Sequence, residues 1–135
     1  MGRKLDQVTI RGFKSIASLE GFALGDLNVL IGANGAGKSN FVEFFRLLRA
    51  IVEQRLQSYM LENGPADGYF HNGVGFTKAI EAELDFGLNA YRFQLKPTAL
   101  GTVIIDSEKT VFHGGSGESV KLLGSAKLES ALKAR

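Results

Sequence analysis

The chain has no cysteine among its 135 residues. Disulfides and thiolate metal sites are therefore excluded, and the composition fits a reducing cytoplasm. No apolar run approaches the roughly twenty residues of a membrane-spanning helix. Polar residues also interrupt the apolar core that an amino-terminal signal peptide needs. We expect a soluble, cytoplasmic protein without a membrane partner.

Long runs of one charge are missing as well. No run of five or more basic residues occurs, and the formal net charge is only +2. An isoelectric point near 9.0 therefore gives little support for a nucleic-acid partner. The apolar share of 44% and the charged share of 22% are those of an ordinary globular protein. A chain of this length suits one domain with a real hydrophobic core.

The sequence does contain a phosphate-binding pattern at residues 32–39, Gly-Ala-Asn-Gly-Ala-Gly-Lys-Ser. Its glycines, Gly32, Gly35 and Gly37, let backbone N–H groups converge on a polyphosphate. Lys38 is expected to reach the β and γ phosphates, and the Ser39 hydroxyl is expected to be a ligand of Mg²⁺. The alternative is a glycine-rich turn whose lysine and serine are merely solvated.

The flanks of this pattern favour the nucleotide interpretation. Residues 27–31 are typical of a short buried strand, and apolar residues at helical spacing predict a long helix over about 38–60. Strand, loop and helix in that order are the context that a phosphate-binding loop requires. Two further short strands, at 5–11 and 16–24, are expected to form a small sheet beside it.

An antiparallel meander is predicted over about 78–113. Residues 78–86 and 91–96 alternate between apolar and polar, and a loop at 87–90 would place Leu84 opposite Phe93. The glycines at 114–117 predict a flexible linker, and the last residues to 135 predict a short amphipathic helix. The fold class is thus α/β: residues 1–113 form a small mixed sheet, a long helix after the phosphate loop and an antiparallel β meander, and residues 114–135 form a linker and a short terminal helix.

Residues that would cleave a bound triphosphate are not visible. A P-loop ATPase needs an acidic strand that organises Mg²⁺ and the attacking water. Val103–Asp106 comes nearest, but it has only three apolar residues, and Ser107 separates Asp106 from Glu108. We interpret both acids as part of the meander. His71 lacks the neighbours of a triad or a metal set and is interpreted as a surface or structural histidine.

A family resemblance adds to this interpretation. Residues 8–15, Val-Thr-Ile-Arg-Gly-Phe-Lys-Ser, followed by residues 27–40, resemble the amino-terminal lobe of the SMC/RecF-type ABC ATPases, and more narrowly the RecF-like bacterial "AAA family" ATPases. The likeness covers about residues 5–113. It implies that the corner Arg11–Ser15 lies beside the nucleotide, with Lys14 as a phosphate or base contact. The residues that it implies for ATP and Mg²⁺ are Asn34, Gly35, Ala36, Gly37, Lys38, Ser39 and Asn40.

The resemblance also implies partners. It implies a missing carboxy-terminal lobe or second subunit, and a homodimer in which two molecules sandwich two ATPs. Related proteins act on DNA ends, in repair or in phage defence. The chain is then a fragment or truncated product, an ATPase lobe that hydrolyses ATP only when a second lobe or partner chain completes it. The alternatives are a non-catalytic nucleotide-sensing interaction module and a protein that binds DNA directly.

Overall fold

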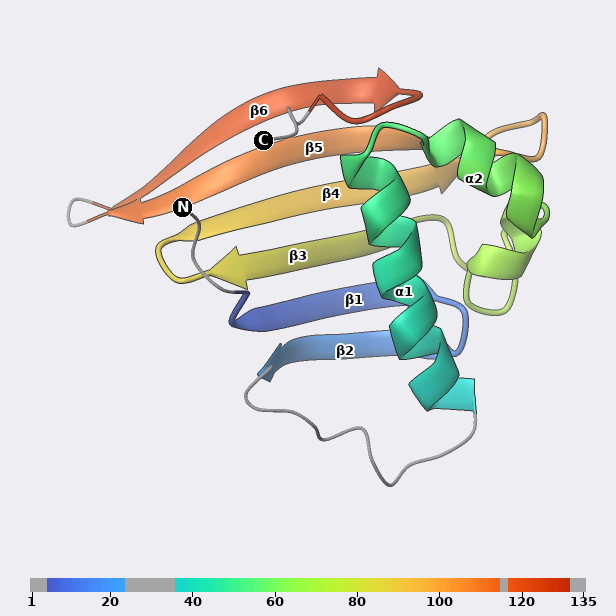
Figure 1. Cartoon of the computed structure of the whole chain (residues 1–135), viewed down its shortest axis with the longest axis horizontal. Helices are drawn as coiled ribbons and strands as arrows, with labels where there is room; N and C mark the ends of the chain where they lie inside the picture. The colour runs from blue at the N-terminus through green and yellow to red at the C-terminus, as the bar shows by residue number, and fades with distance from the viewer. Residues whose placement is uncertain (1–4, 24–35, 115–116, 132–135) are drawn as a thin grey trace.

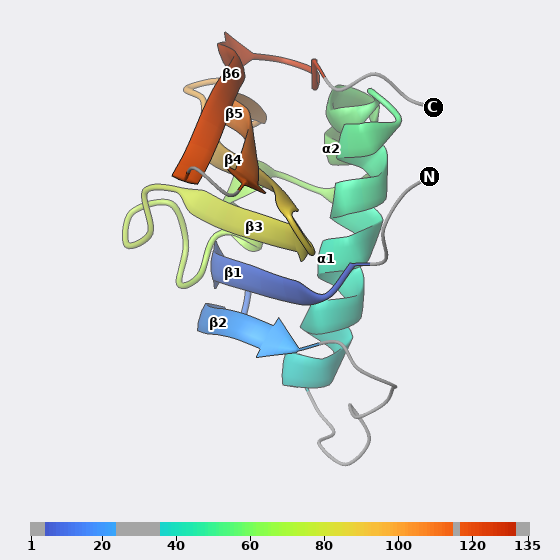
Figure 2. The ribbon, with the colours of Figure 1, turned by 90° about the vertical axis from the view of Figure 1, so that its left-hand side faces the viewer.

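Strands are the largest part of the fold and form one sheet. The computed structural model describes residues 5–23, 36–114 and 117–131. In these residues, the strands pair antiparallel in the order β2-β1-β3-β4-β5-β6. They are β1 (Gln7–Phe13), β2 (Ile16–Ala23), β3 (Ile80–Phe86), β4 (Asn89–Pro97), β5 (Val103–Gly114) and β6 (Gly117–Lys127). Two helices, α1 (Ala36–Val52) and α2 (Leu56–Asn63), lie on one face of the sheet (Figures 1 and 2), and a 3₁₀ turn, η1 (Ala66–Tyr69), follows them.

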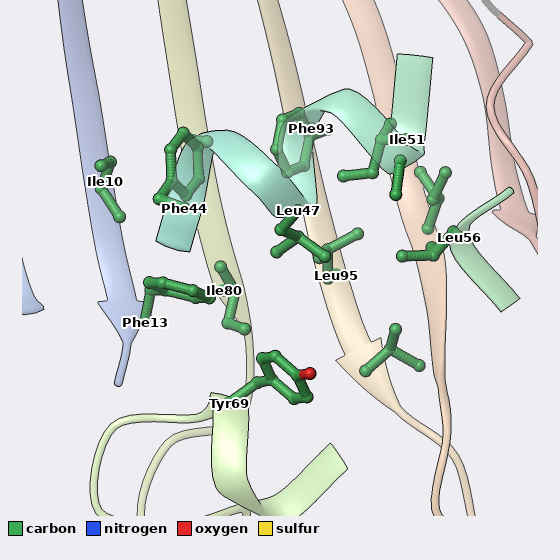
Figure 3. Packing of buried hydrophobic residues seen from close by; sticks show 14 of the residues in the cluster. Ile10, Phe13, Phe44, Leu47, Ile51, Leu56, Tyr69, Ile80, Phe93 and Leu95 are labelled. Carbon is green, nitrogen blue, oxygen red and sulfur yellow. The ribbon is translucent and has the colours of Figure 1, made fainter. Parts of the chain in front are cut away.

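The hydrophobic core lies between α1 and the sheet, because each presents apolar residues at its own period. Phe44, Leu47 and Ile51 of α1 are spaced by three or four residues and are almost fully buried. The Phe44 ring stacks 6.4 Å from the Phe93 ring of β4 and meets the Phe13 ring of β1 edge-on at 5.7 Å (Figure 3). Burial of each such side chain stabilises the fold by about 1.5–3 kcal/mol. These contacts fix α1 across β1, β3 and β4.

The prediction of one helix over about 38–60 is wrong, because the helix is interrupted at Gln54. This residue has φ +59, in the left-handed region. Its N–H donates to the Ile51 carbonyl at 3.0 Å, and the Arg55 N–H donates to the Ala50 carbonyl at 2.9 Å. The two bonds form a Schellman end, in which the left-handed residue is usually glycine. A glutamine at that position gives no such signal in the sequence.

The start of α2 is capped by Glu129, a residue far along the chain. The Leu56 and Gln57 N–H groups donate to the Glu129 carboxylate at 2.7 and 3.1 Å. This carboxylate satisfies two of the N–H groups that a helix leaves unpaired at its start. The break between α1 and α2 therefore depends on a contact that local sequence patterns do not contain.

The hairpin of β3 and β4 is confirmed, but its register differs from the prediction by two residues. Leu84 pairs with Tyr91 instead of Phe93. The connecting loop has two residues in place of four, and it begins with Gly87 at φ +79, as tight hairpins with glycine at the first loop position do. Side chains alternate with a period of two, so a shift of two residues leaves every side chain on the same face. The apolar pattern alone therefore cannot distinguish the two registers.

The prediction of a linker and a terminal helix over 114–135 is wrong for the residues that the structure describes there. Residues 117–127 form β6, which pairs with β5 from Gly114 opposite Gly117 to Ile105 opposite Lys127. Residues 128–131 are not helical. They instead run back toward α2, where Glu129 binds the start of that helix. Residues whose local composition predicted a linker therefore form a strand, because they pair with β5.

The predicted small sheet and the meander are joined in one sheet. Val8 of β1 pairs with Leu84 of β3, and Ile10 pairs with Ala82. All strand pairs in the described part of the chain are antiparallel, whereas a mixed sheet was expected. The predicted strand at 27–31 lies outside the described residues. None of the described helices is long and apolar enough to cross a membrane.

Candidate functional site

The phosphate-binding pattern ends inside the first turn of α1. Ser39 is exposed there and Asn40 is half-buried. No acidic residue occupies this turn, so no side chain in it offsets the positive end of the helix. Unpaired backbone N–H groups and this dipole suit an anion. The predicted residues Gly32, Asn34 and Gly35 lie outside the described residues, and Ala36, Gly37, Lys38, Ser39 and Asn40 begin the helix.

The β1–β2 hairpin turn lies beside this helix start. The Asn40 side-chain amide donates to the Ser15 hydroxyl at 2.8 Å. One residue further along α1, the Phe41 ring meets the Phe22 ring of β2 edge-on at 5.5 Å. These two contacts hold the corner Arg11–Ser15 next to the end of the phosphate-binding pattern. The sequence indicated that proximity only through the family resemblance.

Lys14 sits at the tip of the corner in the left-handed conformation, with φ +49. Its backbone N–H donates to the Tyr69 carbonyl at 2.8 Å. Its ammonium group lies 4.8 Å from the centre of the Tyr69 ring, a cation–π contact. Burial, and then the charge of Glu43, raises the pKa of Tyr69, so its neutral hydroxyl can donate to the Asn63 carbonyl at 2.9 Å. The structure thus places the Lys14 side chain over an aromatic ring at the edge of the candidate site.

The segment 69–77 completes this corner. The His71 backbone N–H donates to the Gly12 carbonyl at 2.9 Å, and His71 Nδ1 lies 2.7 Å from the Lys14 carbonyl oxygen. Gly12 has φ +77, and a Cβ there would lie 2.7 Å from the Ala79 carbonyl oxygen, so only glycine fits. Sequence reasoning did not place His71 beside the corner Arg11–Ser15, because no motif connects the two.

The acidic residues of β5 are engaged elsewhere. Asp106 lies in the meander, as predicted, where it forms an ion pair with Lys96 at 3.3 Å. Two strands, β3 and β4, separate β5 from β1 and the corner. In the described ranges, no cluster of three or more His, Cys, Asp or Glu is arranged to hold a metal ion. The role of Ser39 as a Mg²⁺ ligand stays a prediction.

Glu108 has a role that the sequence did not reveal. Its side chain is fully buried. It accepts hydrogen bonds from the Tyr91 hydroxyl, from the Ser130 hydroxyl and, at 2.8 Å, from the Ala131 N–H. Burial, and then the bond to Glu108, raises the pKa of Tyr91. The carboxylate therefore attaches residues 128–131 to the sheet, and it is not placed to activate water at the start of α1.

Comparison with known proteins yields one family. Residues 27–110 match the model of a family described as "AAA domain, putative AbiEii toxin, Type IV TA system". The matched stretch contains the whole phosphate-binding pattern, both helices, β3, β4 and most of β5. Searches of curated proteins and of solved structures found no match.

Proposed function

The chain belongs to this AAA-domain family of the P-loop ATPase type, whose model matches more than half of it, and on that premise we propose that it binds Mg-ATP at the start of α1. Backbone N–H groups of residues 32–39 surround the phosphates, Lys38 neutralises the β and γ phosphates, and Ser39 is a ligand of Mg²⁺. One observation carries the proposal: the pattern ends in the first turn of a helix whose start is bonded to the hairpin corner through Asn40 and Ser15. That geometry leaves the positive end of the helix next to a polar surface.

We extend the proposal to a RecF/SMC-like lobe that hydrolyses ATP only with a second lobe or partner chain, as a homodimer would supply. The carboxylates of β5 support the need for a second lobe or partner chain. Asp106 is paired with Lys96, and Glu108 is surrounded by three donors. Neither is free to organise Mg²⁺ or water, and both lie away from the start of α1. DNA repair and phage defence are the processes in which such a lobe would act.

The same observation favours a second candidate, a non-catalytic nucleotide-sensing module. Such a module would bind Mg-ATP and respond by contact with a partner, without turnover. Phosphate release measured in parallel with equilibrium binding separates the two. Binding without turnover, with hydrolysis restored by a second lobe, supports the ATPase lobe. Turnover by this chain alone would contradict the division of labour proposed above.

The binding experiment compares the wild type with Lys38→Ala by isothermal titration of Mg-ATP. Loss of charge-assisted bonds to the phosphates should raise the dissociation constant about tenfold to a hundredfold. Lys109→Ala is the matched control, because Lys109 lies in β5, which β3 and β4 separate from β1 and the corner. Equal affinity in Lys38→Ala and wild type would contradict the proposal.

A further inference from the structure

The strand β6 forms an outer edge of the sheet. It pairs with β5 on one side, and among the described residues no strand lies on its other side (Figure 1). The residues that follow β6 do not cover this free edge, because they cross to the helix side of the sheet (Figure 2), where Glu129 caps α2. The outward N–H and C=O groups of β6 are therefore open to pairing with another chain.

This edge lacks most of the features that prevent sheet edges from pairing. Proteins protect such edges with short strands, proline, bulges or a covering segment. The strand β6 has 11 residues and no proline. Its bulge lies at Leu123, which has no partner in the ladder with β5. Residues 117–122, before the bulge, pair one to one with β5 and form a regular edge.

Apolar side chains lie along this regular part of the edge. Val120 and Leu122 are 51% and 64% exposed. Leu122 pairs with Lys109, which in turn pairs with Arg92 of β4. The next residue of β4, Phe93, packs on α1, so the row that contains Leu122 and Val120 lies on the face away from the helices. Two exposed apolar side chains therefore accompany the unpaired backbone groups.

We propose that a second copy of this chain pairs with β6 antiparallel across a twofold axis, which makes a dimer with one continuous sheet. All strand pairs in the described part of the chain are antiparallel. A twofold axis perpendicular to the sheet extends the same pattern and uses the same patch on both molecules. Residues directly opposite each other then share a face, and an axis at Val120 places this side chain opposite its own copy.

The charges of β6 favour this position of the axis. With the axis at Val120, Glu118 lies opposite Leu122 of the copy, and Lys121 lies opposite Ser119, so like charges are never directly opposite. An axis at Lys121 would place two ammonium groups opposite each other. An axis at Leu122 would bring the bulge into the interface, and an axis at Ser119 would leave Leu122 outside the paired stretch.

This contact goes beyond the proposed function and does not depend on it. Among the described strands, β6 and β2 are at opposite ends of the sheet order. The corner Arg11–Ser15 and the start of α1 lie on the side of β1 and β2. Pairing through β6 therefore keeps the two nucleotide sites apart, unlike a dimer in which two molecules sandwich ATP. Mg-ATP should leave the affinity of the β6 contact unchanged.

Single-cysteine variants test the position of the axis, because the chain has no cysteine. Residues directly opposite have Cβ atoms about 4.5–5.5 Å apart, close to the spacing in a disulfide. Val120→Cys should form a disulfide-linked dimer under mild oxidation at least about tenfold faster than Leu61→Cys. Leu61 is the matched control, because it is 87% exposed on α2 and meets its copy only by random collision. Equal rates would overturn the proposal.

Sedimentation velocity of the whole chain measures the association itself. Two strand edges bury less area than a standard interface, so the dissociation constant should be about 10–100 µM. Val120→Lys puts two ammonium groups at the axis and should raise this constant about three- to tenfold. Leu100→Lys is the control and should not change it, because Leu100 is 92% exposed in the β4–β5 loop. Circular dichroism should be the same for all three chains.

The outcomes separate this contact from the proposed function. A wild type that stays monomeric at about 500 µM overturns the β6 dimer. A dimer that Val120→Lys does not weaken, or that Mg-ATP dissociates, also overturns it, because another surface then makes the contact. A β6 dimer that forms as described in a chain that does not bind Mg-ATP contradicts the proposed function and supports this inference.

Discussion

The two ends of α1 carry polar clusters of opposite character. The corner cluster at its start, Lys14, Ser15, Asn40 and His71, is exposed or half-buried. The tail cluster beyond its end, Tyr91, Glu108, Glu129 and Ser130, is mostly buried, with Glu108 at 0% exposure. Surface groups can exchange a protein partner for a ligand at little cost, whereas buried groups lose their only partners. The corner cluster is therefore suited to binding, and the tail cluster is suited to holding the fold together.

The role of the tail cluster in stability is tested most strongly by removing the residue at its centre. Glu108→Ala removes the carboxylate that accepts hydrogen bonds from two buried hydroxyl groups and from the partly buried Ala131 N–H, so the free energy of unfolding should fall by about 2–4 kcal/mol. Urea unfolding followed by circular dichroism measures the loss. Asp106→Ala is the control: its ion pair with Lys96 is partly exposed and should contribute less than about 1 kcal/mol. Equal losses in the two variants would show that Glu108 is not the buried support described here.

Glu129→Ala should have a smaller effect in the same cluster. It removes the acceptor of the Leu56 and Gln57 N–H groups, and the loss of a helix cap costs about 1 kcal/mol. Thermal unfolding measures it. Glu62→Ala, on the exposed side of α2, should leave the transition unchanged. Mg-ATP affinity should be unaffected in both, and a Glu129→Ala variant that lost nucleotide affinity would break the separation of the two clusters.

The corner cluster is tested by a double-mutant cycle between Asn40 and Ser15. Their bond lies at the surface, so its coupling to stability should be only about 0.5–1 kcal/mol, from Asn40→Ala, Ser15→Ala and the double variant. The same cycle measured on Mg-ATP affinity should show coupling of similar size, because the bond joins the corner to the start of α1. Strictly additive effects on affinity would mean that the corner is not part of the site.

The smallest effect on stability at neutral pH is expected from the ionisation of the tyrosines. Burial is the main cause that raises the pKa of Tyr59, Tyr69 and Tyr91. Their folded-state pKa values thus exceed the ordinary value near 10, so the stability linked to them is fully present below about pH 10 and is lost as the pH rises further. Absorbance of the phenolate, recorded with circular dichroism, should show tyrosine ionising together with unfolding. Ionisation of all three near pH 10 in a still folded chain would contradict their burial.

Local sequence patterns predicted the secondary-structure features that neighbouring residues in the chain determine. The strands of the meander, β3, β4 and β5, are of this kind, because turn residues and periodicity specify them. The break at Gln54 was not predictable, since its cap lacks glycine and Glu129 supports the next helix from far along the chain. The buried role of Glu108 likewise depends on Ser130 and Ala131.

The corner cluster likewise combines residues that the local sequence indicated with one that it did not. Lys14 and Ser15 belong to a recognisable stretch beside β1, whereas His71 joins them only through backbone pairing with Gly12 and the bond to the Lys14 carbonyl. No residue spacing encodes that pairing. The strand β6 was missed for a related reason: most of its residues are exposed, so its apolar residues do not mark a buried face.

Titration of Mg-ATP into the ¹⁵N-labelled chain, followed by the backbone amide resonances, tests the central claim most directly. The account predicts large, saturable shifts at residues 36–40 and at Lys14 and Ser15, and none at Glu108, Ser130 and Ala131. Saturable shifts confined to the tail cluster, or no shifts at the start of α1, would contradict it.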